Sequence, residues 1–379
     1  MSLPVSVTYI VSDLNKSMAF EWIAQYLSRE KCRLSFILLN AGDTELEQFL
    51  RAHNVPVHRV VYTRKTQLIG AIKEVYRCLK SWKTAVVHTH LFNANVVGLA
   101  AARLAGVSKR ILTRHHSSLH HHFFPRAVYY DRLTNYLATD IVAISEIVRR
   151  IVVDWEAVPP AKVHLIHHGF DLSAFAQVTP DRVKALQDKY GITPDGPVVG
   201  IIARQTIWKG IQDVIPAVAE LRKQYPTIQL VLANAHGDYQ EQIKELLQNH
   251  LSPEAYTQIR FESDVPALYQ LFDVYVHVPI DNHSEAFGQT YVEALASGIP
   301  SVFTLSGVAP EFVRDGENAL VVPFQDSEAI RQAIQRLLTD ESLRRTCTEN
   351  GKRSVQQFAL QPYLDKLERL YTQPSSYNP

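Results

Sequence analysis

Two glutamates lie eight residues apart in the segment EAFGQTYVEALASGIP, residues 285–300. If residues 287–297 are helical, this spacing separates Glu285 from Glu293 by roughly 12 Å, at about 1.5 Å per residue. The separation exceeds the roughly 5–9.5 Å between the carboxylates of glycosidases, and it suits the two ends of an extended ligand. The N-terminus of such a helix offers unpaired N–H groups to an anion, and Gly288 lets a ligand approach the backbone there. Two solvated charges on an amphipathic helix are the alternative interpretation.

Two cations follow a strongly apolar run in the segment VVGIIARQTIWKG, residues 198–210. Arg204 stands just after the expected strand, and Lys209 stands before a helix entered through Gly210. Ligands of open parallel sheets bind beyond the carboxyl ends of the strands. Two cations at that edge can neutralise a diphosphate without a metal ion, and a pair of solvated loop cations is the alternative.

Several common catalytic motifs are absent from the sequence. None of the 15 glycines belongs to a G-x-G-x-x-G or a G-x-x-x-x-G-K-[ST] pattern, and neither G-x-S-x-G nor H-E-x-x-H occurs. These absences argue against a standard dinucleotide fingerprint, a P-loop, a serine hydrolase elbow and a zinc protease. No Asp-x-Asp pair occurs that could hold a divalent cation on a sugar diphosphate, so no metal site is expected.

Histidines and cysteines are the remaining metal-ligating residue types. The histidines gather in one short segment, at positions 115, 116, 120, 121 and 122, with no Cys or carboxylate beside them in the sequence. We expect a polar active-site loop there rather than a metal site. The three cysteines, at positions 32, 78 and 347, lie far apart, which indicates neither a disulfide framework nor a zinc site and favours a reducing cytoplasm.

Short apolar runs alternate with amphipathic stretches along the chain, a pattern typical of parallel sheets with helices on both faces. The expected helices include residues 17–30, 66–81, 92–105 and 126–138. The expected strands are residues 5–10, 34–39, 85–88, 111–113, 141–144 and 163–166, then 198–203, 229–233, 274–278 and 301–303. Because 379 residues exceed one compact core, we predict an α/β protein of two doubly wound, Rossmann-like domains. The linker is expected within Gln177–Pro197, where Pro194 and other turn residues gather, with 181–190 as an alternative short helix.

The charge is distributed unevenly although the net charge is only +1. Residues 1–178 carry 21 Lys or Arg against 13 Asp or Glu, whereas residues 179–379 carry 18 against 25. The basic first half predicts an anionic partner, either an acidic acceptor or a membrane surface, unless the charges fell this way by chance. The segment FFPRAVYYDRLTNYL (123–137) combines aromatic and basic residues, which suits either a membrane interface or packing inside the first domain. No secretory signal and no membrane-spanning run is recognisable, so a cytoplasmic protein, peripheral at most on the inner face of a membrane, is expected.

Together these residues resemble the retaining, nucleotide-sugar-dependent glycosyltransferases of family four (glycosyl transferases group 1), which have the two-domain GT-B fold. Glu285 and Glu293 match the family's E-x7-E signature, and Arg204 and Lys209 match its Arg/Lys pair. The similarity extends through VVHTHLFNANVVGLAAARLAG (86–106), AISE (143–146), HLIHHGFDLSAF (164–175) and SGVAPEFVRDGENALVVP (306–323). The resemblance implies an acceptor-binding domain over residues 1–178, a donor-binding domain over 179–355 and a cleft between them. It also implies that residues 356–379 form a helix that crosses back to the first domain.

The resemblance further implies a role for each matching position. Glu285 would contact donor sugar hydroxyls, and Glu293 would bind the ribose. Arg204 and Lys209 would neutralise the diphosphate and stabilise the departing nucleoside diphosphate, a task that metal ions perform in other transferases. The backbone from Ala286 through Phe287 to Gly288 would meet the sugar and the distal phosphate. In ILTRHH, His115 rather than His116 would reach the donor sugar.

Two loops depart from the family pattern. The loop SDLNKSMAFE (12–21) lacks the Gly-Gly that many relatives have, so either Asn15 and Lys16 approach the donor phosphate or the loop is shaped for the acceptor. The loop NAHGD (234–238) lacks the usual Gly-x-Gly, although Asn234 and Gly237 leave room for a nucleotide contact.

The expected activity is therefore the transfer of a hexose-type sugar, with retention and without a metal ion. The co-substrate would be a UDP- or GDP-linked sugar, and the acceptor would be a hydroxyl of a glycan, a lipid-linked molecule or a small molecule, with an anionic acceptor among the alternatives. No cofactor and no nucleic acid is expected. Closure of the two domains would assemble the site. A sugar-nucleotide epimerase, a sugar phosphorylase and a non-catalytic nucleotide-sugar-binding subunit are the alternatives.

Overall fold

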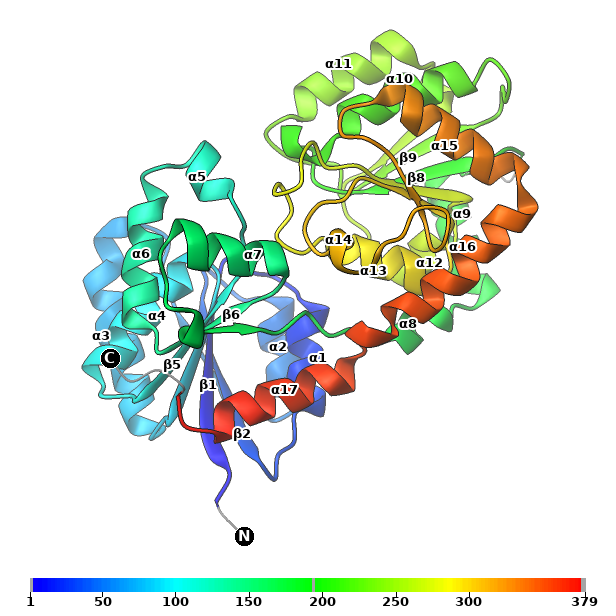
Figure 1. Ribbon diagram of the computed structural model, residues 1–379. Helices are drawn as coiled ribbons and strands as arrows, with labels where there is room; N and C mark the ends of the chain where they lie inside the picture. Colours follow the sequence, from blue (N-terminus) through cyan, green and yellow to red (C-terminus); the bar gives the residue numbers. More distant parts are fainter. Residues whose placement is uncertain (1–2, 193–194, 376–379) are drawn as a thin grey trace. The chain divides into compact units, whose positions relative to one another are not determined.

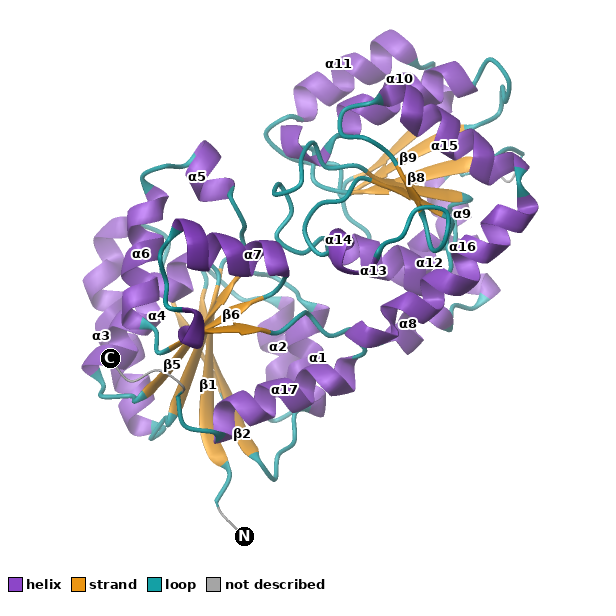
Figure 2. Ribbon diagram, viewed as in Figure 1, coloured by secondary structure: helices purple, strands orange, loops and turns teal. Residues whose placement is uncertain are grey.

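The computed structural model describes residues 3–192 and 195–375, which divide into two compact units. The described residues up to Phe170 and those from Leu360 onward form the first unit, and Asp171–Ala359 belong to the second. Each unit is built on a parallel sheet with helices packed on it, as Figure 2 shows. The predicted α/β class with two parallel sheets is therefore confirmed. No helix within the described residues is long and apolar enough to cross a membrane.

The described residues of the first unit form a seven-stranded parallel sheet in the order β3-β2-β1-β4-β5-β6-β7. Its strands are β1 (Val5–Ser12), β2 (Cys32–Leu39), β3 (Val57–Val60), β4 (Val86–His90), β5 (Lys109–Arg114), β6 (Asp140–Ala143) and β7 (Val163–Leu165). Its helices include α1 (Met18–Tyr26), α2 (Glu45–Ala52), α3 (Leu68–Ser81), α4 (Phe92–Leu104), α5 (Leu119–Phe123), α6 (Ala127–Leu137) and α7 (Glu146–Arg150). Four of these, α1, α3, α4 and α6, lie within the expected helical stretches.

In the core of the first unit, apolar residues of α3 and α4 pack against the central strands of the sheet. Ile10, Val87 and Val97 are fully buried there because the central strands are covered on both faces. Gly98 of α4 permits the close approach, since a Cβ at this position would lie 2.8 Å from the Thr89 side chain. α4 therefore packs directly on β1 and β4.

The C-terminal helix α17 (Leu360–Thr372) belongs to the first unit, as the sequence predicted. In Figure 1 it is drawn in red beside β1. The hydroxyl of Tyr371 is hydrogen-bonded to the Tyr9 hydroxyl and lies 2.8 Å from Nδ1 of His88. The buried Glu368 accepts a 3.0 Å bond from the Ser28 amide, which ties the helix to the end of α1.

The described residues of the second unit form a six-stranded parallel sheet in the order β10-β9-β8-β11-β12-β13. Its strands are β8 (Val198–Ile202), β9 (Gln229–Ala233), β10 (Tyr256–Ile259), β11 (Val274–His277), β12 (Ser301–Phe303) and β13 (Leu320–Val321). Its helices include α8 (Leu172–Ala176), α9 (Pro180–Tyr190), α10 (Ile211–Leu221), α11 (Gln240–His250), α12 (Val265–Tyr269), α13 (Gln289–Ala296), α14 (Ala309–Phe312), α15 (Ser327–Thr339) and α16 (Glu341–Ser354).

The expected strands correspond to ten of the observed ones, and the other three lie at edges of the sheets. β3, β10 and β13 were not expected from the sequence, because short edge strands carry polar or half-buried residues and lack a continuous apolar run. Within the expected linker, residues 180–190 form α9, the helix considered as the alternative. Its Arg182 pairs with Asp264 at 2.5 Å, so α9 packs on the second unit. Pro194 lies outside the described residues.

Candidate active site

Three side chains meet at the carboxyl edge of the second sheet. β8 and β11 are neighbours, so the turn that follows β8 and the end of β11 lie side by side. The turn Ile207–Lys209 presents Lys209, and β11 ends at His277. The Glu285 carboxylate is ion-paired with Nζ of Lys209, and its Oε1 lies 3.2 Å from Nε2 of His277. The sequence predicted Glu285 and Lys209 as site residues but not their mutual contact, and it missed His277.

This group is a fixed pair of opposite charges with a neutral imidazole beside it. Burial raises the pKa of Glu285, but the Lys209 charge and the His277 contact outweigh burial, so the pKa lies well below its ordinary value. Burial lowers the pKa of His277, and the Glu285 carboxylate does not reverse this. Glu285 is therefore ionised at neutral pH. The ammonium of Lys209 carries three N–H donors, so donors remain for a second anion.

The loop from Glu285 to Gly288 presents backbone groups next to this pair. The Glu285 amide donates to Oγ of Ser306 at 3.1 Å, and the Phe287 carbonyl accepts from the Val308 amide at 3.0 Å. Gly288 has φ 80°, and a Cβ at this position would lie 2.5 Å from the Tyr291 ring. Only glycine fits this left-handed position without strain.

The predicted helix over residues 287–297 is corrected by the structure. α13 spans Gln289–Ala296, because the left-handed backbone of Gly288 ends the helix on its N-terminal side. Glu285 therefore lies in the preceding loop, and the helical spacing of 12 Å does not apply to the pair. Both Glu285 and Glu293 are 7% exposed, so the alternative of two solvated surface charges is wrong.

Glu293 is a buried residue of α13, the helix that follows the loop from Glu285 to Gly288. Its Oε2 accepts a 2.9 Å hydrogen bond from the Tyr269 hydroxyl. Burial raises the pKa of Glu293 to about 7, although the Tyr269 hydrogen bond lowers it. The pKa values of these two buried carboxyl groups are therefore shifted in opposite directions: a cation lowers that of Glu285, and burial raises that of Glu293.

The remaining predicted residues of the second unit lie on neighbouring loops. Arg204 follows β8, and its side chain is exposed and forms no ion pair with any described residue. Asn234 follows β9 with φ 60°, and its carbonyl accepts from the His236 amide at 2.8 Å. The two loops are joined, because the Gln205 amide donates to the His236 carbonyl at 2.8 Å. Arg204 and Asn234 therefore lie on loops of one edge, which is the edge of Lys209 and Glu285.

In the first unit, the predicted residues also follow strands. Asn15 and Lys16 come after β1 and contact Glu45 at the start of α2, with Nδ2 of Asn15 at 2.9 Å and Nζ of Lys16 at 3.4 Å from its carboxylate oxygens. His115 comes after β5, and its Nε2 lies 3.0 Å from Nδ1 of His90. Burial and the neighbouring histidines lower the pKa of His115, so this side chain is neutral. Its contact with the donor sugar stays a prediction.

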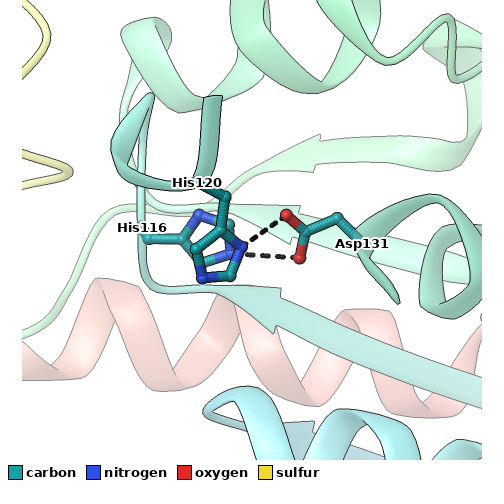
Figure 3. Close-up of side chains that lie close together, drawn as sticks. All are labelled: His116, His120 and Asp131. Carbon is teal, nitrogen blue, oxygen red and sulfur yellow. Dashed lines mark hydrogen bonds and ion pairs between the residues drawn. The ribbon is translucent and has the colours of Figure 1, made fainter. Parts of the chain in front are cut away.

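Figure 3 shows a cluster formed by His116, His120 and Asp131. Nδ1 of His120 lies 2.6 Å from Oδ2 of Asp131, and Nε2 of His116 lies 3.2 Å from Oδ1. No carboxylate stands beside these histidines in the sequence, but α6 brings Asp131 to them in the fold. The sequence held no local signal of this contact, since Asp131 lies eleven residues beyond His120.

The ligand atoms of the cluster are close enough together to hold a metal ion, since they lie within 4.8 Å of one another. A guanidinium already occupies this neighbourhood: Nη1 of Arg114 lies 3.4 Å from both Oδ2 of Asp131 and Nε2 of His116. Glu156 fixes Arg114 through bonds of 2.8 and 2.9 Å. A divalent cation at the cluster would be repelled by this buried charge, so we interpret the cluster as an ion network that holds the turn between α5 and α6.

Comparisons with known proteins identify the family of this chain. Residues 22–174 match the family model "Glycosyltransferase Family 4", and residues 183–354 match "Glycosyl transferases group 1". The chain is 25% identical over 324 residues to alpha-monoglucosyldiacylglycerol synthase of Acholeplasma laidlawii, covering 80% of this chain and 79% of the relative. It is 25% identical over 343 residues to the capsular polysaccharide biosynthesis glycosyltransferase CapM of Staphylococcus aureus, covering 88% of each.

Solved structures show the same fold. Anabaena HepE in complex with UDP and glucose has a TM-score of 0.82 at 19% identity and covers 96% of this chain and 98% of its own. Sucrose-phosphate synthase from Thermosynechococcus elongatus has a TM-score of 0.77 at 18% identity, with 97% and 98% covered. The two parallel sheets and the return of α17 to the first unit are those of the GT-B fold. The two family matches together span most of the chain, which therefore belongs to the family-four glycosyltransferases, retaining enzymes that transfer a sugar from a nucleotide sugar.

Proposed function

We infer that the second unit binds a nucleoside-diphosphate sugar without a metal ion. The observation that carries this proposal is the buried, ionised Glu285 paired with Lys209 beside the N-terminus of α13. In this proposal Lys209 and the exposed Arg204 neutralise the diphosphate, and the N–H groups that follow Gly288 contact the distal phosphate. Glu285 accepts hydrogen bonds from the sugar hydroxyls, and Glu293 accepts them from the ribose.

The chemical step in this proposal breaks the bond between the anomeric carbon and the phosphate oxygen. The acceptor oxygen forms its bond on the same face of the sugar, and the departing phosphate takes the acceptor proton. Lys209 and Arg204 offset the charge that develops on the leaving group, which is the usual task of a bound metal. Support comes from the position of Lys209, whose free N–H donors stand beside the ionised Glu285.

The first unit is proposed to bind the acceptor, and a glycan, a lipid-linked molecule and a small molecule all fit the family. Its excess of basic residues favours an anionic acceptor. The name of the Acholeplasma relative includes diacylglycerol, and that of the Staphylococcus relative includes a capsular polysaccharide. The donor base is proposed to be uracil or guanine, and the HepE complex with UDP supports uracil.

The experiment follows UDP-glucose and GDP-mannose by NMR in the presence of diacylglycerol, phosphatidylinositol or an oligosaccharide. We expect one donor to be consumed in the presence of an acceptor, with retained anomeric configuration and no loss of rate in EDTA. Lys209→Met and Glu285→Gln should lower the rate at least a hundredfold. Lys223→Met is the matched control, because Lys223 pairs with Glu220 on the surface of the same unit. An isomer formed from the donor alone would favour an epimerase, and sugar phosphate formed from inorganic phosphate would favour a phosphorylase.

A further inference from the structure

The first unit contains an apolar pocket that the donor site does not use. Its volume is about 760 Å³, within the roughly 300–1,000 Å³ typical of small-ligand pockets. The pocket lies between the starts of α3 and α4 and the turn that joins α5 to α6. Its apolar walls include Tyr62, Leu68, Phe92, Val96, Phe124 and Tyr130.

The walls of this pocket are held in place by ring contacts. The Phe92 ring packs edge-on against Tyr130 at 5.8 Å and against His120 at 5.4 Å, measured between ring centroids. The Phe124 ring packs edge-on against His120 at 6.4 Å. His120 is itself held by Asp131 in the cluster of Figure 3. The ion network therefore supports a preformed pocket rather than a loose turn.

The pocket leaves a costly amount of aromatic surface in water. Phe124 is 55% exposed, Tyr130 is 46% exposed and Phe92 is 38% exposed. Single exposed apolar side chains are common on soluble proteins, but a contiguous exposed apolar patch marks a binding site. The sequence left open whether the segment 123–137 lies at a membrane interface or packs inside the first domain. The start of this segment forms one wall of the pocket.

The surroundings of the pocket indicate what it would bind. Lys65 and Arg126 line it, are exposed and form no ion pair with any described residue. Asn93 also lines it and donates a 2.8 Å hydrogen bond to Asp13, the residue that follows β1. The pocket thus opens at the carboxyl edge of the sheet, where ligands of such sheets bind. An apolar interior beside two unpaired cations complements a molecule with a hydrocarbon chain and an anionic group.

We propose that this pocket binds the hydrocarbon chain of an anionic amphiphilic acceptor, with Lys65 and Arg126 contacting its acidic group. This proposal adds the chemical class of the acceptor to the proposed function. It rests on that function, because only a glycosyltransferase would use the bound amphiphile as an acceptor. The lipid chain is bound as a single molecule in a pocket, which differs from adsorption of the whole unit on a membrane surface.

The experiment titrates the full chain with alkyl phosphates below their micelle concentrations, using calorimetry. Dodecyl phosphate should bind at one site per chain, and butyl phosphate should bind too weakly to measure. Between these lengths, each added pair of methylene groups should tighten binding roughly tenfold until the pocket is filled. Uncharged dodecyl maltoside should bind at least tenfold more weakly than dodecyl phosphate.

Matched variants localise the binding. Phe124→Asp should weaken dodecyl phosphate binding at least tenfold, whereas Tyr136→Asp should not, because Tyr136 is 79% exposed near the end of α6 but does not line this pocket. Lys65→Glu should weaken binding several-fold, and Lys80→Glu, the same charge change at the far end of α3, should not. All four positions are exposed, so circular dichroism should report an unchanged fold.

Several outcomes would overturn the proposal. Equal binding of dodecyl maltoside would remove the anionic contact, and equal weakening by Phe124→Asp and Tyr136→Asp would indicate general surface adsorption. A lack of dodecyl phosphate binding by a chain that binds a nucleotide sugar would refute the pocket alone. Binding of dodecyl phosphate without binding of any nucleotide sugar would leave the pocket standing and refute the proposed function instead.

Discussion

Replacing Lys209 by methionine should destabilise the second unit and reverse its response to pH. The substitution keeps most of the side-chain volume but removes the cation that faces Glu285. The Glu285 side chain is 9% exposed, so its carboxylate would remain buried without a charge partner. Breaking a buried pair in this way costs about 3–5 kcal/mol. Because the Lys209 side chain is 16% exposed and solvent reaches the site, we expect the low end, about 3 kcal/mol at pH 7.

The sign of the pH dependence follows from the direction of the pKa shift. In the parent protein the folded-state pKa of Glu285 is depressed, so its contribution to stability is present above the unfolded pKa of about 4.3 and is lost as the pH falls below it. Without Lys209, burial raises the folded-state pKa above that value, and stability is then lost as the pH rises. Loss of the Lys209 charge also makes protonation of His277 easier, which would restore a cation at acidic pH. Both effects predict that Lys209→Met costs less at pH 5 than at pH 7.

The assay is urea unfolding of the full chain at pH 5 and pH 7. Because a chain of two units need not unfold in one step, hydrogen exchange in β8 and β11 should report the stability of the second unit separately. Lys223→Met should change stability by no more than about 0.5 kcal/mol, because its partner Glu220 lies on the surface. The reasoning fails if Lys209→Met costs no more than this control at pH 7, or if its cost grows as the pH falls.

Three further predictions concern the same framework. Gly288→Ala should cost at least about 1 kcal/mol in urea unfolding and abolish nucleotide-sugar binding, whereas Gly316→Ala, also at positive φ but in open space, should leave binding intact. Glu293→Gln should make the protein more stable than the parent at pH 8 and equally stable near pH 4, because a folded-state pKa raised to about 7 loses stability as the pH rises from about 4.3; equal urea curves at pH 8 would contradict this. Deleting residues from Leu360 onward should unfold the first unit while the second stays folded, as hydrogen exchange would reveal, because α17 buries Leu364, Leu367 and Tyr371 there.

The central strands of both sheets could be read from the sequence because burial on both faces demands continuous apolar runs. VVGIIA was expected at residues 198–203 and β8 spans Val198–Ile202. The edge strand β3, with the sequence VHRV, carries no such run. It is a strand because it pairs with β2, and its own residues do not indicate that structure. The docking of α17 on the first unit was predicted from the family resemblance alone, since its partners Tyr9 and His88 lie far away in the sequence.

The contacts within the candidate site could not be predicted from the sequence, and the roles of its residues stay predictions. Glu285 and Lys209 stood out through the family motifs, although the bond between them joins residues 76 positions apart. His277 was hidden because it ends a buried strand, where a histidine is equally compatible with the core. The start of α13 was misplaced by two residues because a left-handed glycine cannot be recognised without the backbone.

The most direct test of the central claim is a calorimetric titration of the protein with UDP, GDP, ADP and the corresponding nucleotide sugars, in EDTA and without it. We predict that one nucleoside diphosphate binds, that EDTA leaves its affinity unchanged, and that Lys209→Met weakens it at least tenfold while Lys223→Met does not. Binding that disappears in EDTA, or no binding of any of these nucleotides at millimolar concentration, would contradict a metal-free donor site built on Lys209 and Glu285.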